Sequence, residues 1–224
     1  MASWMVHLRI ADTLIDQISR LCPTEFVIGN IAPDSGVPND DWSVFTPSTT
    51  ISHFRTPRHK KADPLNFAEK YFTESLRKSY TPEAFSFYLG YLVHLMTDVA
   101  WSNNILYPAK ERFADEWAAD SNKCIWKMKE DWYDLDFMYL LDHPTFRAFH
   151  LYLNAVGFEN RFMEEFSRDA FENRRQYITG FYLAGKENLD RHYPYLTRDE
   201  MDHFVEQTSA EILTELTEHY GIFK

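Results

Sequence analysis

The stretch TPEAFSFYLGYLVHLMTD, residues 81–98, decides the fold class. It opens with Thr81 and Pro82, a capping side chain followed by proline, which is typical of the start of a helix. The apolar residues 85–96 are fewer than the roughly 20 that a bilayer-spanning helix needs, and Asp98 follows at once. The stretch therefore predicts a long buried helix, over 82–103, and no transmembrane anchor.

Helix signals recur on both sides of this stretch. Asp63 precedes Pro64 in the same way, and Asp142, Ser167 and Thr197 are further candidate caps. The chain has just 7 Gly in 224 residues, no Asn-Gly or Asp-Gly turn and no sustained apolar and polar alternation, which argues against a sheet. We therefore predict an all-α, multi-helix bundle. Its helices are expected near 5–20, 24–31, 64–79, 82–103, 109–119, 122–141, 144–154, 167–188 and 198–219.

One segment, 32–62, departs from this pattern. It contains four prolines, together with Gly36 and several Ser and Thr residues, so we expect an irregular backbone there. Loops of this length inside a compact domain are often functional.

Composition limits the function. The chain has 34 acidic and 23 basic residues, a net charge of -11, so it lacks the broad positive field that binds long nucleic acids. A small phosphorylated substrate remains compatible, because one bound cation can reverse the local field. With 45% hydrophobic residues, 1–224 is expected to form a single domain. Cys22 and Cys124 are too few for a disulfide framework and no signal-peptide pattern opens the sequence, so we expect a cytoplasmic protein with free thiols.

His94 and Asp98 form the pattern H-x-x-x-D, which places an imidazole and a carboxylate on one helix face, one turn apart. In apolar surroundings an ionised Asp needs a partner, and a metal ion is one such partner. A core His hydrogen-bonded to an Asp is the alternative. His7, Asp34 and His53 lie upstream, and imidazole with carboxylate suits Zn²⁺ and related divalent ions. Taken alone, each of these histidines also has a structural explanation. His7 can be an ordinary residue on a helix face, and His53 can be a hydrogen-bond donor in a loop.

Together these motifs resemble the zinc-dependent phospholipase C family, which is related to the S1/P1 nucleases. The resemblance is carried, in this order, by Ser3-Trp4-x-x-His7, FVIGNIAPD at 26–34, Ser52-His53-Phe54 and His94-x-x-x-Asp98.

The resemblance implies an all-helical domain of the phospholipase C and P1 nuclease type, with a zinc cluster that hydrolyses phosphodiesters through metal-activated water. Asp34, His53, His94 and Asp98 would hold one metal, and His7 with Asp98 would help to hold a neighbouring one. Asp34 would also be the catalytic general base or water-orienting carboxylate. We expect one to three Zn²⁺ ions, with other divalent metals as alternatives.

The sequence also departs from the family pattern. In secreted family members the mature chain begins with the Trp, whose amine and carbonyl bind zinc. Trp4 is internal here, so one metal position is expected to lose its amine ligand. The His expected soon after H-x-x-x-D falls near Asn104, and no later His pair follows. The substitutes available are Glu130, Asp131, Asp134 and Asp136, for which an acidic helix surface is the alternative. Asp131 and Asp134 are kept as candidate ligands.

The sequence thus predicts a metal-dependent phosphoester hydrolase, above all a phosphodiesterase, acting on a small phosphorylated substrate or a phospholipid head group. Two alternatives stay open: a non-catalytic helical domain with a structural or vestigial metal, and a nuclease or nucleotide-type phosphoesterase on the same scaffold. The oligomeric state is open too. Aromatic residues near the motifs are expected in the core or against a choline-like head group; they are Trp42, Phe54, Tyr88, Trp101, Trp132 and Tyr133.

Overall fold

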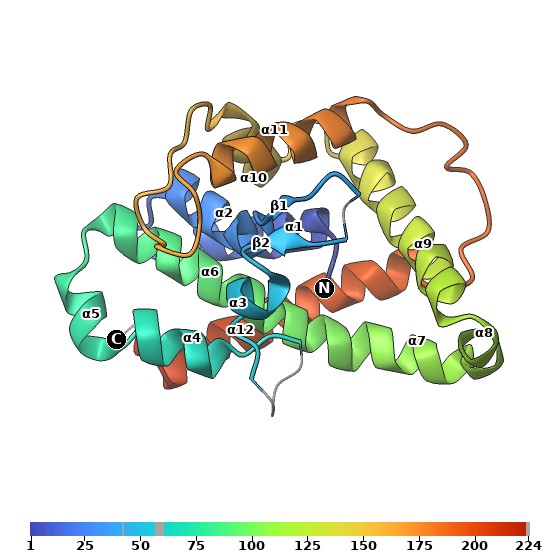
Figure 1. Cartoon of the computed structure of the whole chain (residues 1–224), viewed down its shortest axis with the longest axis horizontal. Coiled ribbons are helices and arrows are strands. Elements are labelled where there is room, and N and C mark those ends of the chain that lie inside the picture. Colours follow the sequence, from blue (N-terminus) through green and yellow to red (C-terminus); the bar gives the residue numbers. More distant parts are fainter. Residues whose placement is uncertain (42, 57–60, 223–224) are drawn as a thin grey trace.

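A computed structural model of the chain describes residues 1–41, 43–56 and 61–222, and it is built almost entirely of helices (Figure 1). The first half contains α1 (Trp4–Ile15), α2 (Pro23–Ile31), the 3-10 helix η1 (Ala32–Asp34), α3 (Thr49–Ser52), α4 (Pro64–Tyr71), α5 (Glu74–Ser79), α6 (Pro82–Trp101) and the π-helix η2 (Ser102–Leu106). The second half contains α7 (Tyr107–Arg112), α8 (Ala114–Ala119), α9 (Ser121–Asp142), α10 (Arg147–Asn154), α11 (Ala170–Leu183) and α12 (Arg198–Glu218). The all-α prediction is confirmed.

Three of the predicted helix starts have the capping contacts that define them. The side chains of Asp63, Thr81 and Thr197 accept the backbone N–H of the third residue of α4, α6 and α12. The other two predicted caps are wrong. Asp142 is the last residue of α9, and Ser167 lies two residues before Asp169, the residue at the N-cap of α11.

The segment 32–62 is more ordered than predicted. Two short strands, β1 (Val37–Pro38) and β2 (Phe45–Thr46), pair antiparallel with Val37 opposite Thr46. The 3-10 turn before them and α3 after them hold the ends of this segment against the helices. Residues 42 and 57–60, which include the predicted aromatic Trp42, lie outside the described part of the chain.

Helices α2 and α6 cross at the centre of the core, and two glycines allow their backbones to touch. A Cβ atom built on Gly90 would lie 2.1 Å from the carbonyl oxygen of Phe26, and one built on Gly29 would lie 2.1 Å from that of Phe87. Only residues without a side chain permit so close an approach. The crossing brings the C-terminal end of α2 next to Gly90 and His94, where the H-x-x-x-D motif begins in the second half of α6.

The remaining helices enclose this crossing. In Figure 1, α10 and α11 lie along the top, α4 and α7 along the bottom, and α9 connects the two levels on the right. Both cysteines are free thiols. In the residues that the structure describes, no helix has the length and apolarity that a membrane span requires.

Candidate metal centre

Helix α6 supplies His94 and Asp98, which lie one turn apart on a buried face; the two side chains are 0% and 1% exposed. His94 Nδ1 lies 2.8 Å from the carbonyl oxygen of Asn30, at the end of α2. Because a carbonyl oxygen can only accept, Nδ1 donates, and Nε2 of a neutral ring carries the lone pair. The α2–α6 crossing therefore orients the free nitrogen of His94 towards Asp98, whose Oδ2 is 3.8 Å away.

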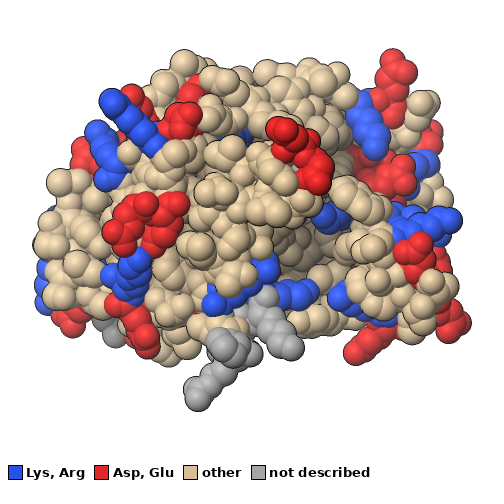
Figure 2. Space-filling model, in the orientation of Figure 1, with Lys and Arg blue, Asp and Glu red and all other residues tan. Residues whose placement is uncertain are grey.

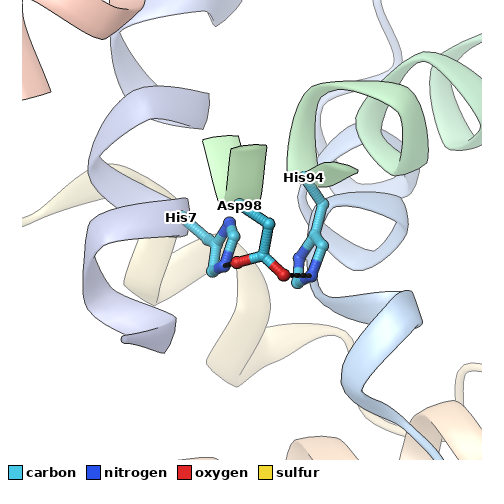
Figure 3. A group of neighbouring side chains, drawn as sticks. All are labelled: His7, His94 and Asp98. Carbon is cyan, nitrogen blue, oxygen red and sulfur yellow. Dashed lines mark ion pairs between the residues drawn. The ribbon is translucent and has the colours of Figure 1, made fainter. Parts of the chain in front are cut away.

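Helix α1 brings a second imidazole to this point. The ring of His7 stacks on that of His94 with centroids 3.8 Å apart and planes 5° from parallel. Its Nε2 is 3.5 Å from Asp98 Oδ1, and within the described residues neither ring nitrogen has a hydrogen-bond partner. Figure 3 shows that the carboxylate of Asp98 contacts both rings, with one oxygen directed towards each. A fully buried imidazole without a partner requires an explanation, and a metal ion provides one.

The segment between α2 and α4 supplies the other two side chains. Asp34 ends the 3-10 turn after α2, and His53 follows α3. Nε2 of His53 lies 3.5 Å from Asp34 Oδ1 and 3.3 Å from Asp98 Oδ2, and its Nδ1 is 2.9 Å from the hydroxyl of Ser52. The indole N–H of Trp4 donates to Asp34 Oδ2 over 3.0 Å. Asp34 and His53 are thus each oriented by a contact outside the group, with Trp4 and Ser52 respectively.

The structure brings five predicted residues into one group, called the His/Asp cluster below: His7, Asp34, His53, His94 and Asp98. They form two sets of three, namely His7 with His94 and Asp98, and Asp34 with His53 and His94, whose ligand atoms lie within 4.8 Å of one another. Two sets sharing His94 are compatible with two neighbouring ions, and imidazole plus carboxylate is a donor set suited to Zn²⁺. The residues present therefore fit the metal predicted from the sequence.

The electrostatics of the cluster favour the metal-binding protonation states of Asp34, Asp98 and His94, whereas His53 is favoured in its protonated form, whose proton a metal would have to displace. Burial alone would raise the pKa of Asp98, but the amino terminus and the contacts with His53 and His7 hold that pKa well below its usual range. Burial would likewise raise the pKa of Asp34, yet the interactions with His53 and His94 lower it. Burial and the neighbouring His7 lower the pKa of His94 to about 3. Burial opposes the charged form of His53, but Asp34 and Asp98 raise its pKa. Two ionised carboxylates and a neutral His94 thus face one another.

A cavity of about 250 Å³ opens beside the cluster. Asp34 and Ser52 form part of its wall, and Trp4, Trp132 and Tyr133 add aromatic surface. Figure 2 shows this side of the molecule hollowed near its centre, with blue Lys and Arg atoms at the edge of the hollow. The donor set thus reaches the cavity wall through Asp34, which leaves space for a small molecule beside the cluster.

The aromatic residues named from the sequence divide between cavity and core. Trp132 and Tyr133 line the cavity. Phe54, Tyr88 and Trp101 are 9%, 8% and 0% exposed and belong to the hydrophobic core.

The structure does not bring Asp131 and Asp134 to the cluster. Arg191 lies 2.7 Å from an oxygen of each, the backbone N–H of Tyr195 donates to Asp131, and Lys186 forms an ion pair with Asp134. In the described part of the chain neither carboxylate belongs to a set of converging ligands. Their role as ligands stays a prediction that this geometry does not favour, because cations of the chain itself already balance their charge.

Two further acidic residues of α9 have other environments. Glu130 is exposed. Asp136 is fully buried and accepts hydrogen bonds of 2.7 Å from both Ser3 and Tyr182. Its carboxyl fixes the first turn of α1, and with it the position of Trp4 and His7.

The sequence analysis missed two cavity residues, Lys129 of α9 and Arg174 of α11. Both belong to helices without a recognisable motif, and Arg174 is 140 residues from Asp34. The pair Arg174-Arg175 is visible in the sequence, but two adjacent arginines usually indicate solvated surface. No local pattern distinguishes a buried arginine from an exposed one.

Comparison with known proteins identifies one relationship. The model of a protein family described as zinc dependent phospholipase C matches residues 6–130, which is more than half of the chain and includes all five residues of the His/Asp cluster. Comparison with curated proteins and with solved structures finds no match.

Proposed function

Because the chain belongs to the zinc-dependent phospholipase C family, we propose that it is a metal-dependent hydrolase that cleaves a phosphoester, specifically a phosphodiester. The observation that carries this proposal is the convergence of the His/Asp cluster. Four separate segments bring three imidazoles and two carboxylates into a buried group beside a cavity. Burying five such groups without a cation is costly, so a structural explanation without metal is the weaker one.

Zinc is the expected metal. The His/Asp cluster would hold a divalent ion that could polarise a phosphoryl oxygen and lower the pKa of a water molecule, which is what phosphoester hydrolysis requires. Asp34 is placed to act with it, because its carboxylate both belongs to the cluster and lines the cavity. With a pKa below its usual range it is ionised at neutral pH, so it accepts a hydrogen bond from a nucleophilic water and orients it.

The substrate proposed is a small phosphorylated molecule or a phospholipid head group. The cavity of about 250 Å³ accommodates a phosphate and a small substituent, not a long polymer in a groove. The net charge of -11 further opposes long nucleic acids.

The test combines metal analysis with turnover. The purified protein is analysed for bound metal by mass spectrometry, and hydrolysis of bis(p-nitrophenyl) phosphate is followed with and without a chelator. We expect bound zinc, chelator-sensitive hydrolysis, and loss of both in His94→Ala and Asp98→Asn. His203→Ala, which removes an exposed imidazole outside the cluster, should retain both. Hydrolysis that survives in His94→Ala would refute the proposal.

The competing function is a non-catalytic domain with a structural metal. The ion pairs of Asp131 and Asp134 with Arg191 favour it, because carboxylates that are already paired do not replace the missing ligands of a third metal ion. In that case the protein binds zinc and melts at a higher temperature with it, but no phosphodiester or phosphomonoester is hydrolysed. Metal content with thermal stability and turnover therefore separates the two functions.

A further inference from the structure

Arg174 of α11 is a buried cation for which the described residues provide no anionic partner. Its side chain is 7% exposed. One guanidinium nitrogen donates to the carbonyl oxygen of Gly36 over 2.7 Å, and the group lies 5.5 Å from the ring of Tyr177. Within the described residues no carboxylate lies in ion-pair range of it. An arginine stays charged at every accessible pH, and charges this deeply buried are normally paired.

The next residue shows the usual arrangement. Arg175 is buried to the same degree, at 6%, and donates two hydrogen bonds of 2.6 and 2.8 Å to Glu172 and a third to the carbonyl oxygen of Leu153. The contrast shows that Arg174, not the helix as a whole, lacks a counter-ion.

A second cation faces the same cavity from α9. Lys129 is half-buried, and its ammonium group lies 4.8 Å from the ring of Trp126. No hydrogen bond or ion pair from it is found among residues 1–41, 43–56 and 61–222, whereas Lys127 on the same helix contacts Glu116 over 2.7 Å. Asp34 is the single carboxylate of the cavity wall in those residues, so a metal that neutralises Asp34 leaves the cavity positive.

We propose that Arg174 and Lys129 bind the phosphate oxygens of the substrate, and that they favour phosphoesters whose remaining part is neutral or anionic over those with a quaternary ammonium group. This inference rests on the proposed function. A guanidinium donates two parallel N–H groups to phosphate, and a nearby ammonium group adds a second charge. The same two charges oppose a cationic head group, since like charges brought together inside a protein lower affinity. The aromatic wall then contacts the apolar part of the substrate.

The first experiment measures binding. Isothermal titration of the zinc-loaded full chain with inorganic phosphate and with phosphorylcholine should give an affinity about tenfold higher for phosphate, which corresponds to about 1.4 kcal/mol. Arg174→Met and Lys129→Met should each lower phosphate affinity about tenfold and reduce the preference. Lys127→Met is the matched control and should bind both compounds as wild type does. Arg174→Lys keeps the positive charge but loses the paired N–H donors of the guanidinium, so its phosphate affinity should lie between those of wild type and Arg174→Met.

The second experiment measures stability, where the two neighbouring arginines should behave oppositely. Without phosphate, Arg174→Met should melt at or above the wild-type temperature, because an unpaired buried charge is removed. Arg175→Met should melt lower, because Glu172 loses its partner. Phosphate should raise the melting temperature of wild type more than that of Arg174→Met.

The outcomes distinguish this inference from the proposed function. Wild-type phosphate affinity in both Arg174→Met and Lys129→Met, or tighter binding of phosphorylcholine than of phosphate, overturns the inference even if phosphodiesters are hydrolysed. Phosphate binding that depends on both residues, in a protein without hydrolytic activity, overturns the proposed function and leaves the anion site standing.

Discussion

The close approach of α2 and α6 makes Gly90→Ala a sharp test of how the fold builds the metal centre. The added methyl group would lie 2.1 Å from the carbonyl oxygen of Phe26 and 2.8 Å from the backbone nitrogen of Asn30, whereas real Cβ contacts essentially never fall below 3.0 Å. Both neighbours are backbone atoms, so no side-chain rotation relieves the clash. The two helices must separate.

The expected change in the free energy of unfolding of Gly90→Ala is the sum of two opposing effects. Replacing Gly by Ala inside a helix ordinarily stabilises by about 1 kcal/mol, because Gly loses more conformational entropy on folding. Overpacking a dense core costs about 1–3 kcal/mol, and backbone contacts belong at the upper end of that range. We therefore expect Gly90→Ala to lose about 1–2 kcal/mol net. Gly180, inside α11, has no atom within 4 Å of its added methyl group, so Gly180→Ala should gain about 0.5–1 kcal/mol.

The separation should also weaken metal binding, because Asn30 holds His94 through the 2.8 Å contact with its carbonyl oxygen and Asp34 follows the same helix. Misplaced ligands and outer partners typically lower metal affinity about 10–100-fold. Urea unfolding of the chelator-treated proteins measures stability, and zinc titration against a competing chelator measures affinity. If Gly90→Ala is as stable as Gly180→Ala and binds zinc with wild-type affinity, the reasoning that α2 and α6 touch at Gly90 and thereby position the metal ligands is refuted.

Three further predictions concern other parts of the structure. Arg191→Met should destabilise the protein by up to about 3 kcal/mol, because the buried carboxylates of Asp131 and Asp134 lose their shared guanidinium and keep only the Tyr195 N–H and Lys186. Zinc content should not change, and a change would show that these two carboxylates contribute to the metal site. Burial raises the pKa of Asp136 to about 7, so the folded state keeps a proton that the unfolded chain loses from roughly pH 4 upwards, and stability should fall as pH rises from there to about 7. Asp136→Asn should remove that fall, of which roughly 3 kcal/mol lies between pH 5 and pH 8, and urea unfolding at these two pH values would measure it; equal losses in both proteins would contradict the assignment. Thr197→Ala breaks the capping box of α12 and should cost about 1 kcal/mol in thermal unfolding, with unchanged activity.

Much of the fold follows from local signals. Capping residues before prolines at Asp63 and Thr81, and the scarcity of glycine, predict the helices because caps and backbone entropy act within one turn. Predicted boundaries failed at two places, one of them a local cap that was overlooked, Thr73, which accepts the backbone N–H of Leu76 at the start of α5. The helix expected over 64–79 breaks between α4 and α5, and the helix expected over 82–103 continues through a π-turn into α7.

The candidate site divides in the same way. The spacing of His94 and Asp98 already places an imidazole and a carboxylate on one helix face, and the motif order relates His7, Asp34 and His53 to them. Sequence spacing cannot show that these five side chains form two ligand sets sharing His94, because that depends on how α1 and the 32–62 segment pack against α6.

What the sequence determined by itself is the helical class and the chemistry of the donor atoms, since both depend on residue types and on neighbours within a turn or two. Only the tertiary structure determined which charged side chains form ion pairs with one another. It pairs Asp131 and Asp134 with Arg191, 57 or more residues away. It also buries Arg174 in a cavity wall, with no counter-ion among the residues that the structure describes. The physical reason is that the energy of a charge depends on its burial and on its partners in space, and neither is encoded in local sequence.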